Sequence, residues 1–129
     1  MEIEDMDGRL VVVAEGKLLD RLRSVRRGGY GAFILSHEDD GPSLWVHMNG
    51  DKAYLHFFRD RDGDHPGFES TSTSPGHSSC HFVQTDGDEA DSFDISGDAV
   101  VAVDLAYTAA VEFFRDGSSM PASITWREA

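Results

Sequence analysis

The stretch SLWVHMNGDKAYLHFF (residues 43–58) decides the fold of this chain. Asn49-Gly50 lies near its centre, and this residue pair favours a tight hairpin turn because both positions accept positive φ. A two-residue turn there would place Val46 opposite Ala53, whereas a four-residue loop would change the partners but keep the faces. The sequence therefore predicts a β-hairpin with one aliphatic face that must be core: Leu44, Val46, Met48, Ala53, Leu55 and Phe57.

The opposite face of this hairpin is aromatic and rich in histidine. Its side chains are Trp45, His47, Tyr54, His56 and Phe58. A face of this composition is amphipathic, so it is either covered by another element or left partly open as a binding surface. Cover by a helix is the favoured interpretation, and an open binding surface is the alternative.

Further strands and two helices are predicted around the hairpin from hydrophobic periodicity. The strand patterns occupy residues 9–15, 32–38, 80–84, a short piece at 92–95, and the residues after Pro121. Another strand is predicted to start at Phe68, after the charged turn that follows the hairpin. Apolar residues at helical spacing predict one helix that ends at Gly28-Gly29 and another that Asp104 caps and Gly117 closes.

These elements predict an α+β fold in a single domain over residues 1–129. We expect a mostly antiparallel sheet of about six strands, with one helix near each end of the chain packed against it. Phe113 and Trp126 lie on the apolar sides of the last helix and the last strand, so both are predicted to be buried.

The chain is strongly acidic, with 24 Asp and Glu against 11 Lys and Arg and a formal charge of −13. Residues 1–64 hold 13 acids and 9 bases, a net −4, and residues 65–129 hold 11 acids and 2 bases, a net −9. Such a chain repels nucleic acid and attracts basic partners. A surface that is acidic only for solubility is the competing explanation.

The cellular compartment follows from cysteine usage and from the apolar runs. The single cysteine, Cys80, excludes an internal disulfide and favours a reducing compartment. The acidic N-terminal residues lack the apolar region of a signal peptide, and no apolar run approaches the roughly 20 residues of a membrane span. We therefore expect a cytoplasmic protein that does not contact a membrane.

The alternating acids of residues 60–64 look like the start of a calcium loop. An EF-hand loop that began at Asp60 would need glycine at its sixth position and glutamate at its twelfth. Those positions hold His65 and Thr71. The sequence therefore does not predict calcium binding here.

Segment 65–81 gathers a second set of possible metal ligands: His65, His77, Cys80 and His81. Structural zinc sites usually pair their ligands in a recognised register, which this spacing lacks. Cys80 with a histidine could form a nucleophile pair, but a buried structural cysteine is the commoner case. No other catalytic motif is present, so we expect a binding protein without cofactor or metal rather than an enzyme. A small metal- or ligand-binding domain that uses this segment is the alternative function.

Two blocks of the chain carry a resemblance to a known family. In YLHFFRDRDGDHPGFES (54–70) an aromatic strand runs into a charged turn and then Pro-Gly-Phe. In the second block, AAVEFFRDG (109–117) is followed by MPASITWRE (120–128), with Pro121 and Trp126 at the positions of the family's proline and tryptophan. In order and spacing these blocks resemble the first-numbered family of immunity proteins from bacterial polymorphic toxin systems.

The resemblance implies a cytoplasmic antitoxin that binds a cognate toxin domain and blocks it. The toxins associated with that family are often directed at nucleic acids, with deaminases prominent. A toxin that grips phosphate backbones is basic around its active site, so an acidic inhibitor would be steered to it. We therefore expect the toxin domain as the partner, covered at its active site, and no nucleic acid partner.

The toxin-binding residues are predicted from the distribution of acids. Residues 86–98 contain no base and show no packing purpose in the sequence, which favours contact with a positive surface. The first choice is Asp86, Asp88, Glu89, Asp91 and Asp94, followed by Asp60, Asp62 and Asp64. The second choice is the aromatic face: Trp45, Tyr54, His56 and Phe58.

Overall fold

The computed structural model describes residues 1–60, 66–72 and 78–129. Two α-helices occur in this part of the chain, α1 (Glu15–Ser24) and α2 (Val103–Arg115). The strands are β1 (Glu2–Asp5), β2 (Gly8–Val11), β3 (Tyr30–Ser36), β4 (Ser43–Asn49), β5 (Lys52–Phe58), β6 (Phe68–Ser70), β7 (Cys80–Phe82), β8 (Phe93–Ile95), β9 (Val101–Ala102) and β10 (Trp126–Glu128). Two 3₁₀ turns flank β8, namely η1 (Glu89–Asp91) and η2 (Gly97–Ala99). The fold class is α+β, as the sequence predicts.

Eight strands form one antiparallel sheet in the order β10-β6-β5-β4-β3-β1-β2, with β9 paired to β5 as well. The short strands β6 and β9 share one edge of β5, and β7 pairs with β8 in a separate sheet. The expectation of about six strands is therefore too low. Sequence periodicity misses β1 because three of its four residues are acidic, and it misses β9 because that strand spans only two residues. The strand predicted to start at Phe68 is confirmed as β6.

β4 and β5 form the predicted hairpin, but the register is shifted by two residues from that of a turn at Asn49-Gly50. The connection consists of Gly50 and Asp51, and Gly50 takes a φ of 60° that few other residues adopt. Val46 consequently lies opposite Leu55. Because the shift is an even number of residues, every side chain stays on its predicted face.

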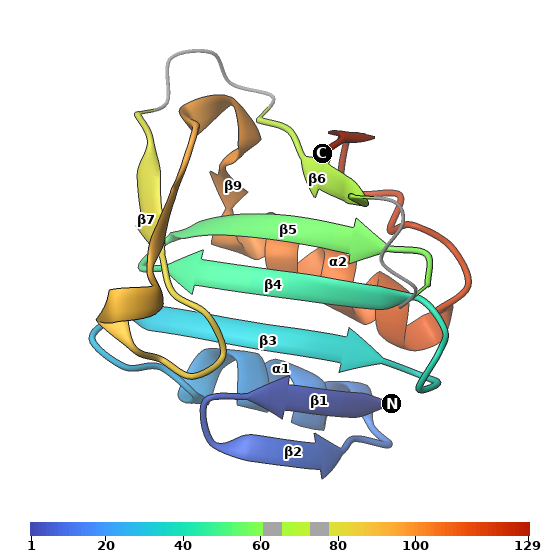
Figure 1. Ribbon diagram of the computed structural model, residues 1–129. Coiled ribbons are helices and arrows are strands. Elements are labelled where there is room, and N and C mark those ends of the chain that lie inside the picture. The colour runs from blue at the N-terminus through green and yellow to red at the C-terminus, as the bar shows by residue number, and fades with distance from the viewer. Residues whose placement is uncertain (61–65, 73–77) are drawn as a thin grey trace.

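Both helices lie on the aliphatic face of the sheet, behind it in Figure 1. α1 contributes Leu18 and Leu22 to the core, and α2 contributes Phe113 together with three alanines. The six aliphatic-face residues of the hairpin are at most 1% exposed, which confirms them as core. The favoured interpretation that a helix covers the aromatic face is wrong. The apolar sides of both helices pack on the other face, where the hairpin presents only apolar side chains.

β1 shows the same separation of faces in a short acidic strand. Ile3 and Asp5 point to the helix side, where Arg21 of α1 holds the buried Asp5 carboxylate through contacts of 2.6 and 2.8 Å. Glu2 and Glu4 lie on the opposite face because side chains alternate along a strand. β1 therefore brings two acids to the face that the helices leave uncovered.

The helix ends differ from those predicted. α1 ends at Ser24, several residues before Gly28-Gly29, and α2 has Ala102 rather than Asp104 at its N-cap position. Asp104 lies in the first turn of α2, where a negative charge still suits the helix dipole. Within the described residues, neither helix is long and apolar enough to cross a membrane.

The burial of the last elements matches the prediction only in part. Phe113 is fully buried, but Trp126 is half-buried and packs at the border of the core. The indole Nε1 of Trp126 donates a hydrogen bond of 2.9 Å to the Pro121 carbonyl. Strand pairing begins only at Trp126, because the residues before it form a turn rather than the predicted longer strand.

Candidate functional site

The face of the sheet opposite the helices is organised in rows, since residues that lie opposite each other in antiparallel strands share a face. The first row is Val11, Glu2, Ser36, Ser43 and Phe58. The second row is Arg9, Glu4, Ile34, Trp45, His56, Glu69 and Arg127. The third is Ala32, His47 and Tyr54, and the fourth is Tyr30, Asn49, Lys52 and Ala102. β7 and β8 cross in front of one end of the sheet (Figure 1). We call rows one and two the open half and rows three and four the closed half.

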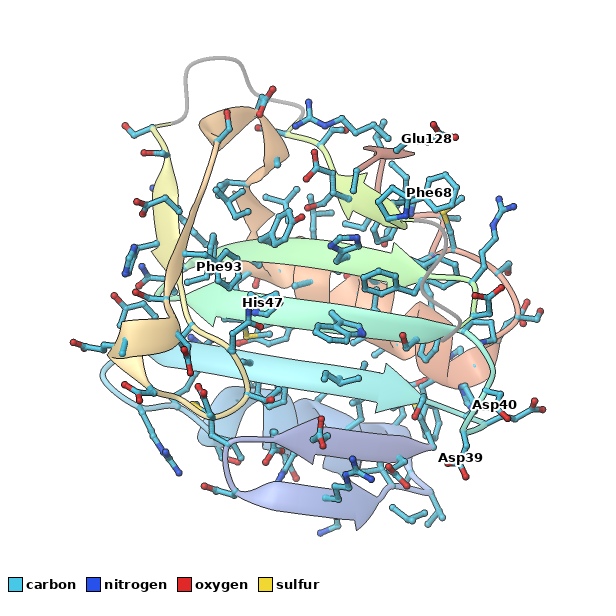
Figure 2. All side chains as sticks on the ribbon, in the orientation of Figure 1. Asp39, Asp40, His47, Phe68, Phe93 and Glu128 are labelled. Atoms are coloured by element: carbon cyan, nitrogen blue, oxygen red, sulfur yellow. The ribbon has the colours of Figure 1, made fainter. Side chains whose placement is uncertain are left out.

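The closed half is covered by a second, smaller apolar cluster beneath β7 and β8. Phe82 of β7 and Tyr54 of β5 are buried there with Ala99 and Val100, and Phe93 of β8 packs against them. The Phe93 ring meets the His47 ring edge-on at 5.0 Å between centroids, as the two labelled side chains show in Figure 2. Two of the five predicted aromatic-face residues are therefore structural.

His47 fixes this cover to the sheet. Its side chain is nearly fully buried, and Nδ1 lies 3.0 Å from the Val83 carbonyl oxygen. Burial lowers the pKa of His47 to about 4, so the ring is neutral near pH 7 and Nδ1–H donates to that carbonyl. Beside it, the Asn49 side chain donates a hydrogen bond of 2.9 Å to the His81 carbonyl.

A polar network joins the closed half to the last strand. The Tyr54 hydroxyl donates to Glu69 at 3.0 Å, and burial together with this bond raises the pKa of Tyr54. Arg127 of β10 holds Glu69 at 2.7 Å and Asp98 at 2.9 and 3.2 Å. The Arg127 guanidinium lowers the pKa of Asp98 to about 2. The network therefore ties β10 and β6 to the segment that follows β8.

The open half contains a hollow of about 380 Å³. The small side chain of Ser43 in the first row lines this hollow beside the much larger Trp45 and Phe58. The indole Nε1 of Trp45 donates to Ser43 Oγ at 3.1 Å, which orients the ring at the wall. The residues that line the hollow are Glu4, Arg9, Ile34, Ser43, Trp45, Phe58 and Asp60.

Aromatic rings form the wall of the hollow and the surface beside it. Trp45 and Phe58 meet edge-on at 5.4 Å, and His56 stacks on Phe58 at 4.2 Å. The His56 Nε2 atom lies 2.6 Å from the Pro66 carbonyl oxygen, and Gly67 follows at a φ of 80°. A Cβ atom on Gly67 would lie only 2.8 Å from His56 Nε2, so glycine is required where the chain returns to this surface.

The rim of the hollow is acidic. Arg9 contacts Glu4 at 2.9 Å and Glu2 at 3.8 Å, and these carboxylates with Asp39 raise the pKa of Arg9. Asp39 follows β3 in the exposed turn labelled in Figure 2, and Asp60 lines the hollow after β5. Among the described residues, four carboxylates against one guanidinium give this rim a formal charge of −3, which favours a cationic partner.

The first-choice acids, residues 86–94, lie in a different part of the molecule, on the segment that joins β7 to β8 and on β8 itself. All five are exposed. Asp86 accepts a hydrogen bond from the Asp88 amide, and Asp88 accepts one from the Ala90 amide, each at 2.9 Å. A side-chain hydrogen bond between Asp86 and Asp91 lowers the pKa of Asp86 and raises that of Asp91. Asp86 and Asp88 thus have a structural role that the sequence does not reveal, because acidic side chains in turns bond to nearby backbone amides.

The structure describes only some of the residues of the alternative metal site. Asp62, Asp64, His65 and His77 lie outside the described residues. Among the residues that are described, no group of three or more His, Cys, Asp or Glu side chains is placed to hold a metal ion. Cys80 accepts a contact of 3.7 Å from Asn49, and His81 pairs with Asp94 at 2.7 Å. Both side chains therefore have partners inside the fold.

The hollow brings together members of both predicted sets. Asp60 comes from the acidic set, and Trp45 and Phe58 come from the aromatic set. Sequence reasoning misses Glu4 and Arg9, because neither lies near the hairpin in the chain. The Asp7-Gly8 pair between two alternating runs is the signal that could have located them, since Asp-Gly favours a hairpin turn.

Residues 16–128 match the family described as immunity protein Imm1. The chain belongs to the Imm1 immunity protein family. The resemblance of the two sequence blocks to the first-numbered immunity family is thereby confirmed. The search of curated proteins found no match to this Imm1 chain.

Membership in the Imm1 family supports an immunity role for the chain. An immunity role implies a cognate toxin as the binding partner and suggests a function without catalysis. The open half of the sheet face, with its hollow and acidic rim, is the candidate surface for that partner.

Proposed function

We propose that this Imm1 protein neutralises a nucleic-acid-directed toxin, such as a deaminase, by binding the catalytic domain and covering its active site. The observation that carries the proposal is the open half, where half-buried aromatic side chains lie within an acidic rim on a face that neither α1 nor α2 covers. We assign the protein to the cytoplasm, where such a toxin meets its substrate.

The composition of the open half supports a protein partner. Aromatic residues are enriched at the centres of protein–protein interfaces, where they supply large contact areas at low conformational cost. Trp45 and Phe58 provide such an area, and Ile34 adds an aliphatic side chain next to them. The surrounding carboxylates select a partner of opposite charge.

The charge of the chain supports a toxin that handles nucleic acid. A domain that binds a phosphate backbone places lysine and arginine around its active site. An inhibitor of net charge −13 is attracted to that surface and repelled by the nucleic acid itself. In this proposal residues 86–94 act mainly at long range, because they speed association without needing a close contact.

The test uses the full-length chain and the catalytic domain of the toxin encoded next to it. Co-expression should protect cells, the two proteins should co-purify, and one equivalent of the chain should abolish the toxin's activity on single-stranded nucleic acid. A toxin that remains fully active at excess chain would refute the proposal. A toxin that is inhibited but still binds its nucleic acid with unchanged affinity would refute only the covering of the active site.

A further inference from the structure

We propose that the hollow in the open half receives an arginine side chain from a loop of the cognate toxin. This inference rests on the proposed function and adds to it the docking surface and the chemical group that enters. Three features of the hollow support it: the aromatic wall, the carboxylate rim and the contrast with the closed half.

The aromatic wall suits a flat cation. A guanidinium stacks on aromatic faces and is weakly hydrated, so it loses little hydration free energy when it leaves water. Trp45 and Phe58 meet edge-on at 5.4 Å, so their rings stand at an angle of 62° and form a corner rather than a flat surface. Ile34 lines the same hollow and offers an apolar contact for the methylene stem of the arginine. A lysine ammonium is compact and strongly hydrated, so its contact with these two rings would contribute less binding free energy.

The carboxylate rim supplies acceptors for the guanidinium N–H groups. Arg9 reaches Glu4 with both Nε and Nη2, and both contacts of 2.9 Å use the same oxygen, Oε1. A carboxylate offers about four acceptor sites on its two oxygens, so Glu4 can accept from a second guanidinium while it holds Arg9. Asp60 lines the same hollow and adds a second negative charge.

The contrast with the rest of the molecule points to this surface. In the closed half, Phe82 and Phe93 already cover His47 and Tyr54, so those rings cannot receive a partner. In the acidic segment, Asp86 and Asp88 bind backbone amides of their own turn. The hollow combines depth, half-buried rings and a negative rim in one place, which is the arrangement expected of an anchor site.

Three double variants with the same net charge test the location. Glu4→Gln with Asp60→Asn alters the rim, Glu89→Gln with Asp91→Asn alters the acidic segment, and Asp20→Asn with Asp104→Asn alters exposed acids on the two helices. Each removes two negative charges, so a general loss of attraction affects all three equally. Binding to the neighbouring toxin domain is measured by surface plasmon resonance at physiological salt.

We expect the rim variant to raise the dissociation rate at least tenfold, and the other two to change it by less than about twofold. Trp45→Ala should raise it by at least as much as the rim variant. Thermal unfolding of each variant checks that the fold is intact. Asp60→Lys keeps the test valid if Trp45→Ala fails to fold, because Asp60 is exposed and the added cation should repel the incoming arginine.

The identity of the entering group is tested on the toxin side. Each arginine in the toxin domain is changed to alanine and combined with Trp45→Ala in a double-mutant cycle. One arginine should be strongly coupled to Trp45, and its replacement by lysine should restore only part of the affinity. If wild-type chain does not bind the toxin, the proposed function falls and this inference with it. If wild-type chain binds but the rim and Trp45 variants bind equally well, or if no arginine is coupled to Trp45, only this inference is wrong.

Discussion

The open and closed halves of one sheet face are built from the same strands, yet they have different roles. β4 and β5 supply His47 and Tyr54 to the closed half, and Trp45, His56 and Phe58 to the open half. The residue types are similar, so composition alone does not distinguish them. The difference is the cover, because β7 and β8 with their apolar cluster bury His47 and Tyr54, whereas Trp45, His56 and Phe58 are only half-buried. Whether an aromatic residue on these strands stabilises the fold or is available for binding therefore depends on whether another element covers it.

The largest expected effect separates the two halves by stability. Phe82 is fully buried in the cluster beneath β7 and β8, whereas Phe58 is half-buried in the open half. Phe82→Ala should reduce the free energy of unfolding by about 3–5 kcal/mol, since it leaves a cavity in a packed cluster. Phe58→Ala should cost about 1 kcal/mol or less by the same measure, because much of its ring is already in water. Urea denaturation of both variants gives the comparison, and equal losses would mean that the two halves do not differ in this way.

The second effect is a dependence of stability on pH that belongs to the closed half. The pKa of His47 is about 4 in the folded chain and about 6.5 when it is unfolded. Protonation therefore favours the unfolded chain below pH 6.5. The contribution of His47 is complete above that pH and is lost as the pH falls to 4, a change of about 3 kcal/mol. His47→Gln keeps a donor for the Val83 carbonyl but does not titrate, so it should lack this part of the pH dependence.

The control for this measurement lies in the open half. His56→Gln makes the same replacement at the half-buried histidine of the second row, so the comparison of the two variants isolates the effect of the cover over His47. Unfolding is followed in urea between pH 4 and 7, and the difference between each variant and wild type removes the contribution of carboxylates. A His47→Gln variant that tracks wild type over the whole range would show that His47 does not titrate with unfolding.

The third effect concerns association and tests the acidic segment. Changing Asp86, Asp88, Glu89, Asp91 and Asp94 to Asn and Gln should lower the association rate with the toxin about tenfold at low salt, and salt should reduce the difference. The fold should persist, because Asn retains the side-chain oxygen that accepts from the amides in this turn. Stopped-flow mixing at several salt concentrations measures the rate. An unchanged rate with unchanged salt dependence would make this segment a passive surface.

The smallest effect is expected at the polar network that ties β10 to the closed half. Arg127 is partly exposed and holds Glu69 and Asp98. Surface ion pairs contribute about 1 kcal/mol or less, because water and salt screen them. Arg127→Gln should therefore lower the free energy of unfolding by no more than that, as measured in urea at moderate salt. A loss comparable to that of Phe82→Ala would show that the network, and not the apolar cluster, holds the cover in place.

The central hairpin could be predicted because its faces depend only on the alternation of side chains, and a two-residue shift in register leaves that alternation unchanged. The turn itself could not be located, since both Asn49-Gly50 and Gly50-Asp51 satisfy the need for a glycine at positive φ. β1 was not predictable by apolar periodicity, because Asp5 occupies an inward position and is stabilised there by Arg21. That pairing depends on contacts between distant parts of the chain.

The candidate site was predictable only in pieces. Trp45 and Phe58 follow from the hairpin, and Asp60 follows from the charged turn after it. Glu4 and Arg9 join them because β1 and β2 add to the far edge of β3, which no local pattern specifies. The cover over His47 also depends on long-range packing, since Phe82 and Phe93 lie more than 30 residues further along the chain.

The alternation along β4 has a consequence for how such a protein can change its target. Leu44 and Val46 face the core, while Ser43 and Trp45 on the same strand face the hollow. A substitution at Ser43 alters the depth of the hollow without removing an atom from the core. Selection for a new partner and selection for the helix-side core therefore act on opposite faces of one strand.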